Sequence, residues 1–453
     1  MKRLIKFLKD YFVLILICLL FLWTRLFRID TIPSSVYWDE ASIGYNAYSI
    51  LKTGRDEWGE FMPLHFRAFG EFKLPVYIYS VAISEAVFGM NAFAVRLPAV
   101  IFGLLSIIGL YLVVLKLTNL KTIALLSSFL FSITPWFFIF SRTGYEATAG
   151  LAFFIWAIYM LMLSDKHKLF IVISSLLFII SAYSYNSFRI LTPLVLGPVL
   201  LFFLLKKKFV VVGISIFILI ASAFPLYKLY REDSGLSRLQ AVGSDNFVQN
   251  YIKNFSPSYL FKVGDTNPRS QMPNNGQLYY LDALFLILGI VYILKSNNLN
   301  LYFILILLLL APIPAAITKE NPHALRSILM APTLSIVSAM GIYFVAKSRK
   351  YLVWVITGVY LIFFANYYKN FLTSYDNLSK SAWQYEYKEI FEKQKEGCVS
   401  DEFAQPYIFA LFYNKVNPND FIKTRELNPV NDWGFSTVKS FGNYTFPKRC
   451  QTN

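Results

Sequence analysis

Charged side chains are scarce in this sequence. They account for 15% of its 453 residues, whereas hydrophobic residues account for 56% and aromatic residues for 18%. Together with a mean hydropathy of +0.49, this composition excludes a water-soluble fold for most of the chain. We therefore expect an all-α polytopic membrane protein.

Cysteine and histidine are also scarce, with three residues of each. No group of them has the spacing of metal ligands, so the sequence predicts neither a metal site built from them nor thiol catalysis. Cys18 lies inside the first apolar run, whereas Cys398 and Cys450 lie in a polar tail. These two would pair only in an oxidising compartment, and the sequence leaves their pairing open.

A signal-peptide cleavage site is absent as well. The first apolar run reaches about Phe27 without a small-residue site, so we expect it to remain as a membrane anchor. The net charge of +16 comes mainly from short basic clusters between apolar runs, such as those at 206–208 and 347–350. Such clusters mark the cytoplasmic side of a membrane protein, so no nucleic-acid partner is expected.

About eleven apolar runs are long enough to cross a bilayer, which takes roughly 20 residues per helix. They lie near residues 11–28, 97–117, 121–140, 147–164, 169–183, 190–205, 209–229, 278–294, 300–317, 327–346 and 351–367. A further run, 74–89, is shorter and contains Pro75 and Glu85. If this run does not cross and the N-terminus is cytoplasmic, the basic clusters all fall on the cytoplasmic side. We therefore place 74–89 flat in the outer membrane interface.

This topology predicts a multi-pass protein of the plasma membrane in two parts. Residues 1–367 would form the transmembrane domain, and residues 368–453 would form a small extracytoplasmic appendage. The outer side would carry the loop 29–96, with interfacial helices at 41–52 and 74–89, and a flexible flap at 230–277. Asp39 would then cap the first of these helices, and Gly54 would end it.

Acidic and basic side chains meet on this predicted outer side. Asp39 and Glu40 are adjacent in the first loop, and several apolar runs are closed by basic side chains at the outer boundary. These are Lys73, Arg142, Arg189, His323 and Arg326. We interpret Arg96 as a plain interface anchor. For the other cations, the alternatives to a substrate contact are lipid headgroups or pairing with Glu71 and Glu146.

One reaction class fits this distribution of charge. Arginine suits phosphate because its planar guanidinium donates two parallel hydrogen bonds. A lipid-phosphate sugar held by these cations could react with an acceptor hydroxyl, whose proton Asp39 would take. Positive charge would stabilise the departing phosphate, and a single displacement would invert the anomeric configuration.

Several motifs follow one another along the outer segments. They read WDEASIGYNAYSILKTGRDEWG, GEFKLPVYIY, FGMNAFAVRLPAVIFG, SRTGYEA and NPHALRSILMAPTLSIVSAMG. In this order they resemble the C-type integral-membrane glycosyltransferases, in the branch of protein O-mannosyltransferases and aminoarabinose transferases. The resemblance spans residues 1–346 and implies a bundle of membrane helices, interfacial helices in the first outer loop and a polyprenyl-phosphate sugar donor.

The resemblance also implies roles for single residues. Asp39 matches the first acidic residue of the family's Asp-Glu motif, which implies a catalytic base. Glu40 matches its neighbour, which implies acceptor or structural contacts. Lys73 matches a lysine that is implied to contact the donor phosphate.

Three further residues match more loosely. Glu146 falls near a second acidic position of some relatives, where its role stays open. His323 and Arg326 occupy the outer loop in which relatives place donor-phosphate contacts. No cofactor is required by these patterns, although the carboxylates of the first loop could hold a divalent metal, as in some relatives.

The sequence therefore predicts a membrane glycosyltransferase that acts on the extracytoplasmic side. The sugar stays open, and the acceptor hydroxyl could belong to a protein, a lipid or a glycan. The alternative is a transporter or flippase of lipid-linked or small solutes, which a many-span bundle also resembles. Charges at the outer rim favour the enzyme, because transporters place ionisable groups near the bilayer midplane.

Overall fold

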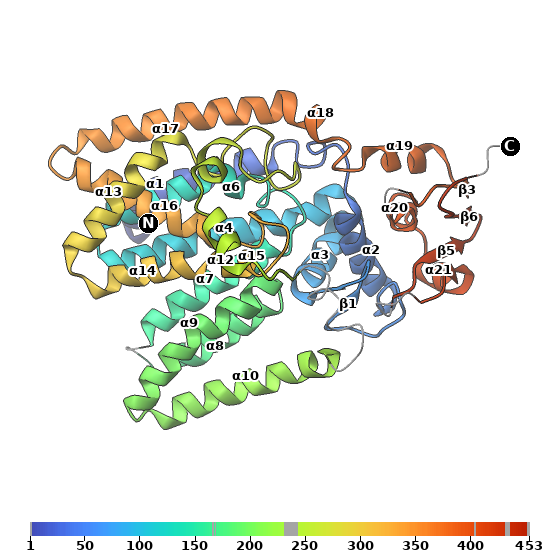
Figure 1. Ribbon diagram of the computed structural model, residues 1–453, viewed down its shortest axis with the longest axis horizontal. Coiled ribbons are helices and arrows are strands. Elements are labelled where there is room, and N and C mark those ends of the chain that lie inside the picture. The colour runs from blue at the N-terminus through green and yellow to red at the C-terminus, as the bar shows by residue number, and fades with distance from the viewer. Residues whose placement is uncertain are drawn as a thin grey trace.

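Long helices lie side by side in a bundle, and the first loop and the C-terminal region lie together at one end of it (Figure 1). The computed structural model describes residues 2–164, 167, 169–230, 243–402, 405–430 and 435–450. The mostly helical architecture expected of a multi-pass membrane protein is thereby confirmed, with short strands in addition in the first loop and the C-terminal region.

A helix forms at each segment that the sequence predicts to span the membrane. These helices are α1 (Lys2–Leu26), α4 (Ala92–Thr118), α5 (Lys121–Ile133) with α6 (Pro135–Phe138), α7 (Ala147–Leu163), α8 (Leu169–Ala182), α9 (Asn186–Leu205), α10 (Phe209–Tyr230), α13 (Tyr280–Ser296), α14 (Leu299–Leu310) with α15 (Ile313–Ala316), α16 (Met330–Ala346) and α17 (Tyr351–Asn370). Within the described part of the chain, five helical segments are long and apolar enough to count as candidate spans: 92–118, 186–205, 209–227, 299–316 and 351–379. The count of eleven spans therefore stays a prediction.

The connections divide between the two ends of the bundle. The loops joining α9 to α10, α13 to α14 and α16 to α17 lie at one end, and the C-terminal strands lie at the other (Figure 1). The basic clusters at 206–208 and 347–350 belong to the first of these ends. Of the predicted basic cluster at 165–168, residues 165, 166 and 168 lie outside the described residues. Which end faces the cytoplasm stays a prediction.

The first loop contains α2 (Trp38–Thr53), the antiparallel strands β1 (Phe66–Arg67) and β2 (Phe72–Lys73), and α3 (Pro75–Phe88). Gly54 ends α2 as predicted, with a φ of 70° and its N–H bonded to Ile50 O. The predicted cap at Asp39 is wrong, because α2 begins one residue earlier and Asp39 lies in its first turn. Most of α2 is buried rather than half-exposed, since α3, α4 and the C-terminal region cover it.

The C-terminal region is a small helical unit with a four-stranded sheet in the order β3-β6-β5-β4. Its elements are η2 (Phe371–Tyr375), α18 (Asp376–Ser379), α19 (Tyr385–Lys393), β3 (Gly397–Cys398), α20 (Pro406–Tyr413), α21 (Pro418–Thr424), β4 (Glu426–Leu427), β5 (Val438–Phe441) and β6 (Tyr444–Thr445). A disulfide joins Cys398 to Cys450, which closes the question that the sequence left open. The unit shares a hydrophobic core with the first loop: a Cβ on Gly44 of α2 would lie 2.6 Å from the Phe412 ring of α20.

The predicted flexible flap at 230–277 packs against the bundle over residues 243–277, and residues 231–242 lie outside the described residues. It contains α12 (Phe247–Lys253) and the π-helical turn η1 (Ser258–Lys262). The buried Asn250 amide of α12 donates to the carbonyl oxygens of Ala316 and Thr318. Buried side-chain bonds of this kind fix a loop in place, so this part of the segment is a packed wall rather than an open flap.

Helices α13 and α16 approach each other most closely at two glycines. A Cβ at Gly289 would lie 2.0 Å from Val337 O, and a Cβ at Gly341 would lie 2.0 Å from Phe285 O. Small residues allow membrane helices to pack backbone against backbone.

We predict that Gly289→Ala lowers the thermal unfolding midpoint, since overpacking of a close helix contact costs roughly 1–3 kcal/mol. Unfolding of the purified protein in detergent would measure the shift. Gly197→Ala on α9 is the matched control, because a Cβ there meets no atom within 4 Å. Equal midpoints for the two variants would contradict the close packing.

Candidate active site

A cavity of about 290 Å³ opens at the end of the bundle that carries the first loop. Its walls come from the start of α2, the end of β2, the turn before α7, the loop after η1 and the loop between α15 and α16. It brings together five of the residues that the sequence predicts for the site. These are Asp39, Lys73, Glu146, His323 and Arg326.

Asp39 and Lys73 form the central ion pair of this cavity. Asp39 lies in the first turn of α2, where the helix dipole favours a negative charge. Lys73 ends β2 and is held there by the short hairpin with β1. Its Nζ lies 2.5 Å from Asp39 Oδ1 and 3.5 Å from Glu71 Oε1. Burial lowers the pKa of Lys73, but the carboxylates of Asp39 and Glu146 outweigh that effect and raise it above its ordinary value.

Glu146 directly precedes α7 and faces the same cavity. Burial raises the pKa of its carboxyl to about 7, against the lowering effect of Lys73 and with a further raising effect from Asp39. Its Oε1 atom is buried and has no hydrogen-bond partner among the described residues. Glu146 is therefore protonated in part of the molecules at neutral pH, and it could donate or accept a proton there.

Three more basic side chains line the cavity, and they come from later segments of the chain than the first loop. Arg326 donates to Thr318 Oγ1 at 2.9 Å and lies 3.2 Å from Glu320 Oε2. His323 lies 3.9 Å from both Glu320 and Asp265. Arg269 was not predicted; its guanidinium lies 5.0 Å from the centre of the Tyr37 ring.

The lining is therefore mixed in charge. Its cations Lys73, Arg269 and Arg326 stand beside four carboxylates. These are Asp39, Glu71, Glu146 and Glu320. The sequence predicts a site rich in cations. In the structure, Lys73 and Arg326 each have an acidic neighbour, and Arg269 lies over an aromatic ring.

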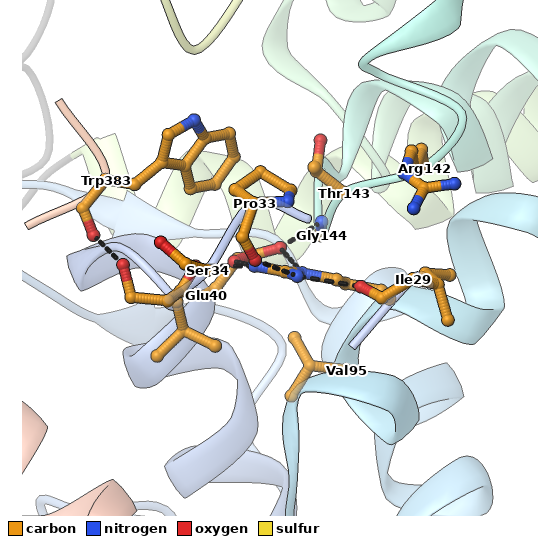
Figure 2. A network of polar contacts seen from close by, with 12 residues as sticks. Ile29, Pro33, Ser34, Glu40, Val95, Arg142, Thr143, Gly144 and Trp383 are labelled. Atoms are coloured by element: carbon orange, nitrogen blue, oxygen red, sulfur yellow. Dashed lines mark hydrogen bonds and ion pairs between the residues drawn. The ribbon is translucent and has the colours of Figure 1, made fainter. Parts of the chain in front are cut away.

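Glu40 does not line this cavity but forms a buried pair with Arg96 (Figure 2). Its Oε2 lies 2.9 Å from Arg96 Nη2, its Oε1 accepts from Arg96 Nε, and both side chains are fully buried. Oε1 also accepts from Gly144 N at 2.7 Å. A Cβ on Gly144 would lie 3.0 Å from Glu40 Cγ, so a larger residue at this position would crowd the Glu40 side chain.

Arg96 thus has a different role from the interface anchor that the sequence predicts. Beyond Glu40, it donates to the carbonyl oxygens of Ile29, Pro33 and Ser35, and so fixes the chain that leads into α2. An arginine inside an apolar helix requires a partner, and this requirement is the signal by which the sequence could have shown that Arg96 is paired, although it does not identify Glu40 as the partner.

Arg142 and Arg189 do not line the cavity either. Arg142 is buried and donates to four carbonyl oxygens, those of Thr24, Arg25, Phe27 and Ile32, so it holds the end of α1 rather than a substrate. Arg189 donates to Ala182 O. From there its charge lowers the pKa of Glu146.

The C-terminal region also fixes the start of α2. The Gln384 side chain accepts from Trp38 N at 2.9 Å, and Trp383 O accepts from Ser35 Oγ at 2.6 Å. The Trp383 ring lies edge-on to Tyr37, with centroids 5.1 Å apart. These contacts fix the residues directly before Asp39 and so hold Asp39 in position.

A divalent metal does not fit the side chains as they lie. In the described ranges, no three His, Cys, Asp or Glu side chains are placed to hold a metal ion together. The ammonium of Lys73 lies where Asp39 and Glu71 come together and neutralises them instead.

We predict that Arg96→Met destabilises the protein by roughly 3–5 kcal/mol, because it leaves the Glu40 carboxylate buried and unpaired. The unfolding midpoint in detergent would measure this loss. The double variant Glu40→Gln/Arg96→Met should recover part of it, since no buried charge remains. If the double variant were less stable than Arg96→Met, the interpretation that Glu40 and Arg96 stabilise the protein as a coupled pair would be wrong.

A second prediction concerns Glu146 and pH. Because its pKa is raised from 4.5 to about 7 in the folded protein, the folded state binds more protons than the unfolded state between these values. Its contribution therefore makes the free energy of unfolding fall as the pH rises through this window. Unfolding midpoints over this range should fall less steeply in Glu146→Gln than in wild type. Parallel curves would contradict the raised pKa.

Comparison with known proteins supports the fold and the motifs. Residues 73–227, about a third of the chain, match the family model of dolichyl-phosphate-mannose-protein mannosyltransferase. No curated protein matches the chain in sequence.

Solved structures share the fold at low identity. ArnT from Cupriavidus metallidurans in the apo state superposes with a TM-score of 0.60 at 10% identity, over 89% of this chain and 84% of that one. The oligosaccharyltransferase AglB from Archaeoglobus fulgidus, in complex with an inhibitory peptide and a dolichol-phosphate, superposes with a TM-score of 0.53 at 14% identity, over 90% of this chain. The match spans 64% of the length of that oligosaccharyltransferase. The resemblance to the C-type glycosyltransferase superfamily is thereby confirmed.

Proposed function

We propose that this protein transfers a sugar from a polyprenyl-phosphate donor to an acceptor hydroxyl, on the extracytoplasmic side of the plasma membrane. The observation that carries the proposal is the cavity in which Asp39 lies with Lys73, Arg269 and Arg326. The family-model match and the dolichol-phosphate bound by the archaeal oligosaccharyltransferase support a lipid-phosphate donor.

The proposed reaction is a single displacement. The acceptor oxygen forms a bond to the anomeric carbon while the bond from that carbon to the phosphate oxygen breaks. The electron pair of the broken bond stays on the phosphate, and the acceptor proton passes to the ionised Asp39 carboxylate. Attack from the face opposite the phosphate inverts the anomeric configuration.

The cations of the cavity have two tasks in this scheme. Arg326, Arg269 and His323 would bind the donor phosphate, and the charge of the two arginines would stabilise the negative charge that the departing phosphate gains. Lys73 would stay between the phosphate and Asp39, and its ammonium would keep Asp39 ionised. Glu146 would contact the sugar or the acceptor.

The acceptor class stays open between a hydroxyl on a protein, a lipid or a glycan. A protein hydroxyl has the most support, because the matching family model describes a protein mannosyltransferase. The archaeal oligosaccharyltransferase has also been tethered to an acceptor peptide in a structure with a TM-score of 0.51, which supports a peptide acceptor without bearing on the acceptor atom.

Asp39→Asn should lower the transfer rate by roughly 100- to 10,000-fold, as expected for the loss of a general base. The assay would follow sugar transfer or donor consumption by the reconstituted protein with a panel of polyprenyl-phosphate sugars. Glu60→Gln is the matched control, because Glu60 is an exposed carboxylate of the same loop outside the cavity. It should keep the wild-type rate.

Two outcomes would count against different parts of the proposal. An Asp39→Asn variant as active as wild type would refute Asp39 as the base but leave the enzyme intact. A wild-type protein that consumes no donor from the panel would refute glycosyl transfer from such donors.

A further inference from the structure

A second cavity, of about 510 Å³, lies where the C-terminal region meets the start of α4. The segment 34–39 separates it from the candidate active site: residues 34–36 line the second cavity, and residues 37–39 line the first. The two cavities have no lining residue in common. The second cavity is therefore separate from the candidate active site.

Groups that attract an anion surround this second cavity. Lys388 of α19 and Lys415, which follows α20, both line it. Ser34 also lines it, and its buried Oγ atom has no hydrogen-bond partner among the described residues. The first turn of α4 adds backbone N–H groups that have no acceptor inside the helix. One of them, the N–H of Ala94, donates to the Asn91 side chain.

Acidic groups offset part of this positive charge. Asp30 is the exposed acidic residue of the lining. Asp376, which does not line the cavity, accepts from Ser34 N at 2.9 Å. Glu85 lies close enough to Lys415 to interact with it, but burial raises the pKa of Glu85 to about 9. Glu85 is therefore mostly protonated at neutral pH, and among the residues of the lining Lys388 and Lys415 outnumber Asp30.

The cavity also lies at the boundary of the bilayer. Helix α4, which begins at Ala92, is a candidate membrane span by its length and composition, so its first turn is expected near one end of the span. The last turns of α3, directly before it, expose large apolar side chains. These are Ile83, Val87 and Phe88, whose exposed fractions are 73%, 72% and 49%. Cations beside exposed apolar side chains at this depth fit both the headgroup and the acyl chain of a lipid.

We propose that this second cavity binds the phosphate headgroup of an anionic membrane lipid whose acyl chains lie along the exposed face of α3. Lys388 and Lys415 belong to the C-terminal region, whereas Asn91 and Phe93 belong to the membrane bundle. The bound lipid bridges the two parts. It holds the C-terminal region against the membrane surface, independently of the reaction in the first cavity.

The test is the affinity of the purified full-length protein for phosphatidylglycerol and for phosphatidylcholine, measured by native mass spectrometry of delipidated protein titrated with each lipid. Phosphatidylglycerol should bind more tightly. Since a lysine near an anionic surface contributes roughly a fivefold factor, Lys388→Gln/Lys415→Gln should weaken its binding about 25-fold.

The matched control is Lys393→Gln/Lys423→Gln, which removes the same charge from exposed positions of the same region outside the cavity. It should bind as wild type does. Lys415→Gln alone keeps the bond from Lys388 Nζ to Ser34 O and should weaken binding roughly fivefold even if the double variant folds poorly.

Three results would overturn the proposal. Equal affinity for the two lipids would show that the site does not select a net negative headgroup. Equal affinity of Lys415→Gln and the control variant would place the lipid elsewhere. Displacement of the lipid by inorganic phosphate at a similar concentration would identify a site for a soluble anion instead.

Discussion

The buried pair of Glu40 and Arg96 is the interaction on which the candidate site depends. An arginine inside an apolar helix is costly unless an opposite charge and further acceptors meet it. Glu40 supplies the charge, and three carbonyl oxygens of the chain before α2 supply the acceptors. Because Asp39 is the neighbour of Glu40, the same pair that neutralises Arg96 also fixes the position of Asp39 over the cavity.

The second feature of the site is the balance of charge around Lys73. Its ammonium lies between Asp39 and Glu71, and Glu146 is close enough to feel it. Burial raises the pKa of Glu146 to about 7, although Lys73 acts to lower it. In the proposed reaction, the ammonium of Lys73 would hold Asp39 as the carboxylate that takes the proton.

Sequence reasoning predicted the helices and part of the site for one reason: apolar runs and charges at their ends are local signals. Asp39, Lys73, Glu146, His323 and Arg326 all lie beside such runs, and the structure brings them to one cavity. Other placements depend on contacts between distant segments, which a sequence read alone does not show. Arg269 lies in a polar loop away from any run, and it reaches the cavity only because that loop packs against the bundle. Arg142 and Arg96 carry the same local signal as Arg326, but carbonyl oxygens and Glu40 from other segments take up their donors.

The contacts of Trp383 and Gln384 with the start of α2 have a consequence for the biogenesis of the protein. These residues follow α17, the last helix of the bundle, yet they hold Ser35 and Trp38, which follow the first. A nascent chain therefore inserts all of its helices before the segment around Asp39 receives its final supports. Translation that stops before Trp383 leaves a chain in which Ser35 and Trp38 lack these two hydrogen bonds.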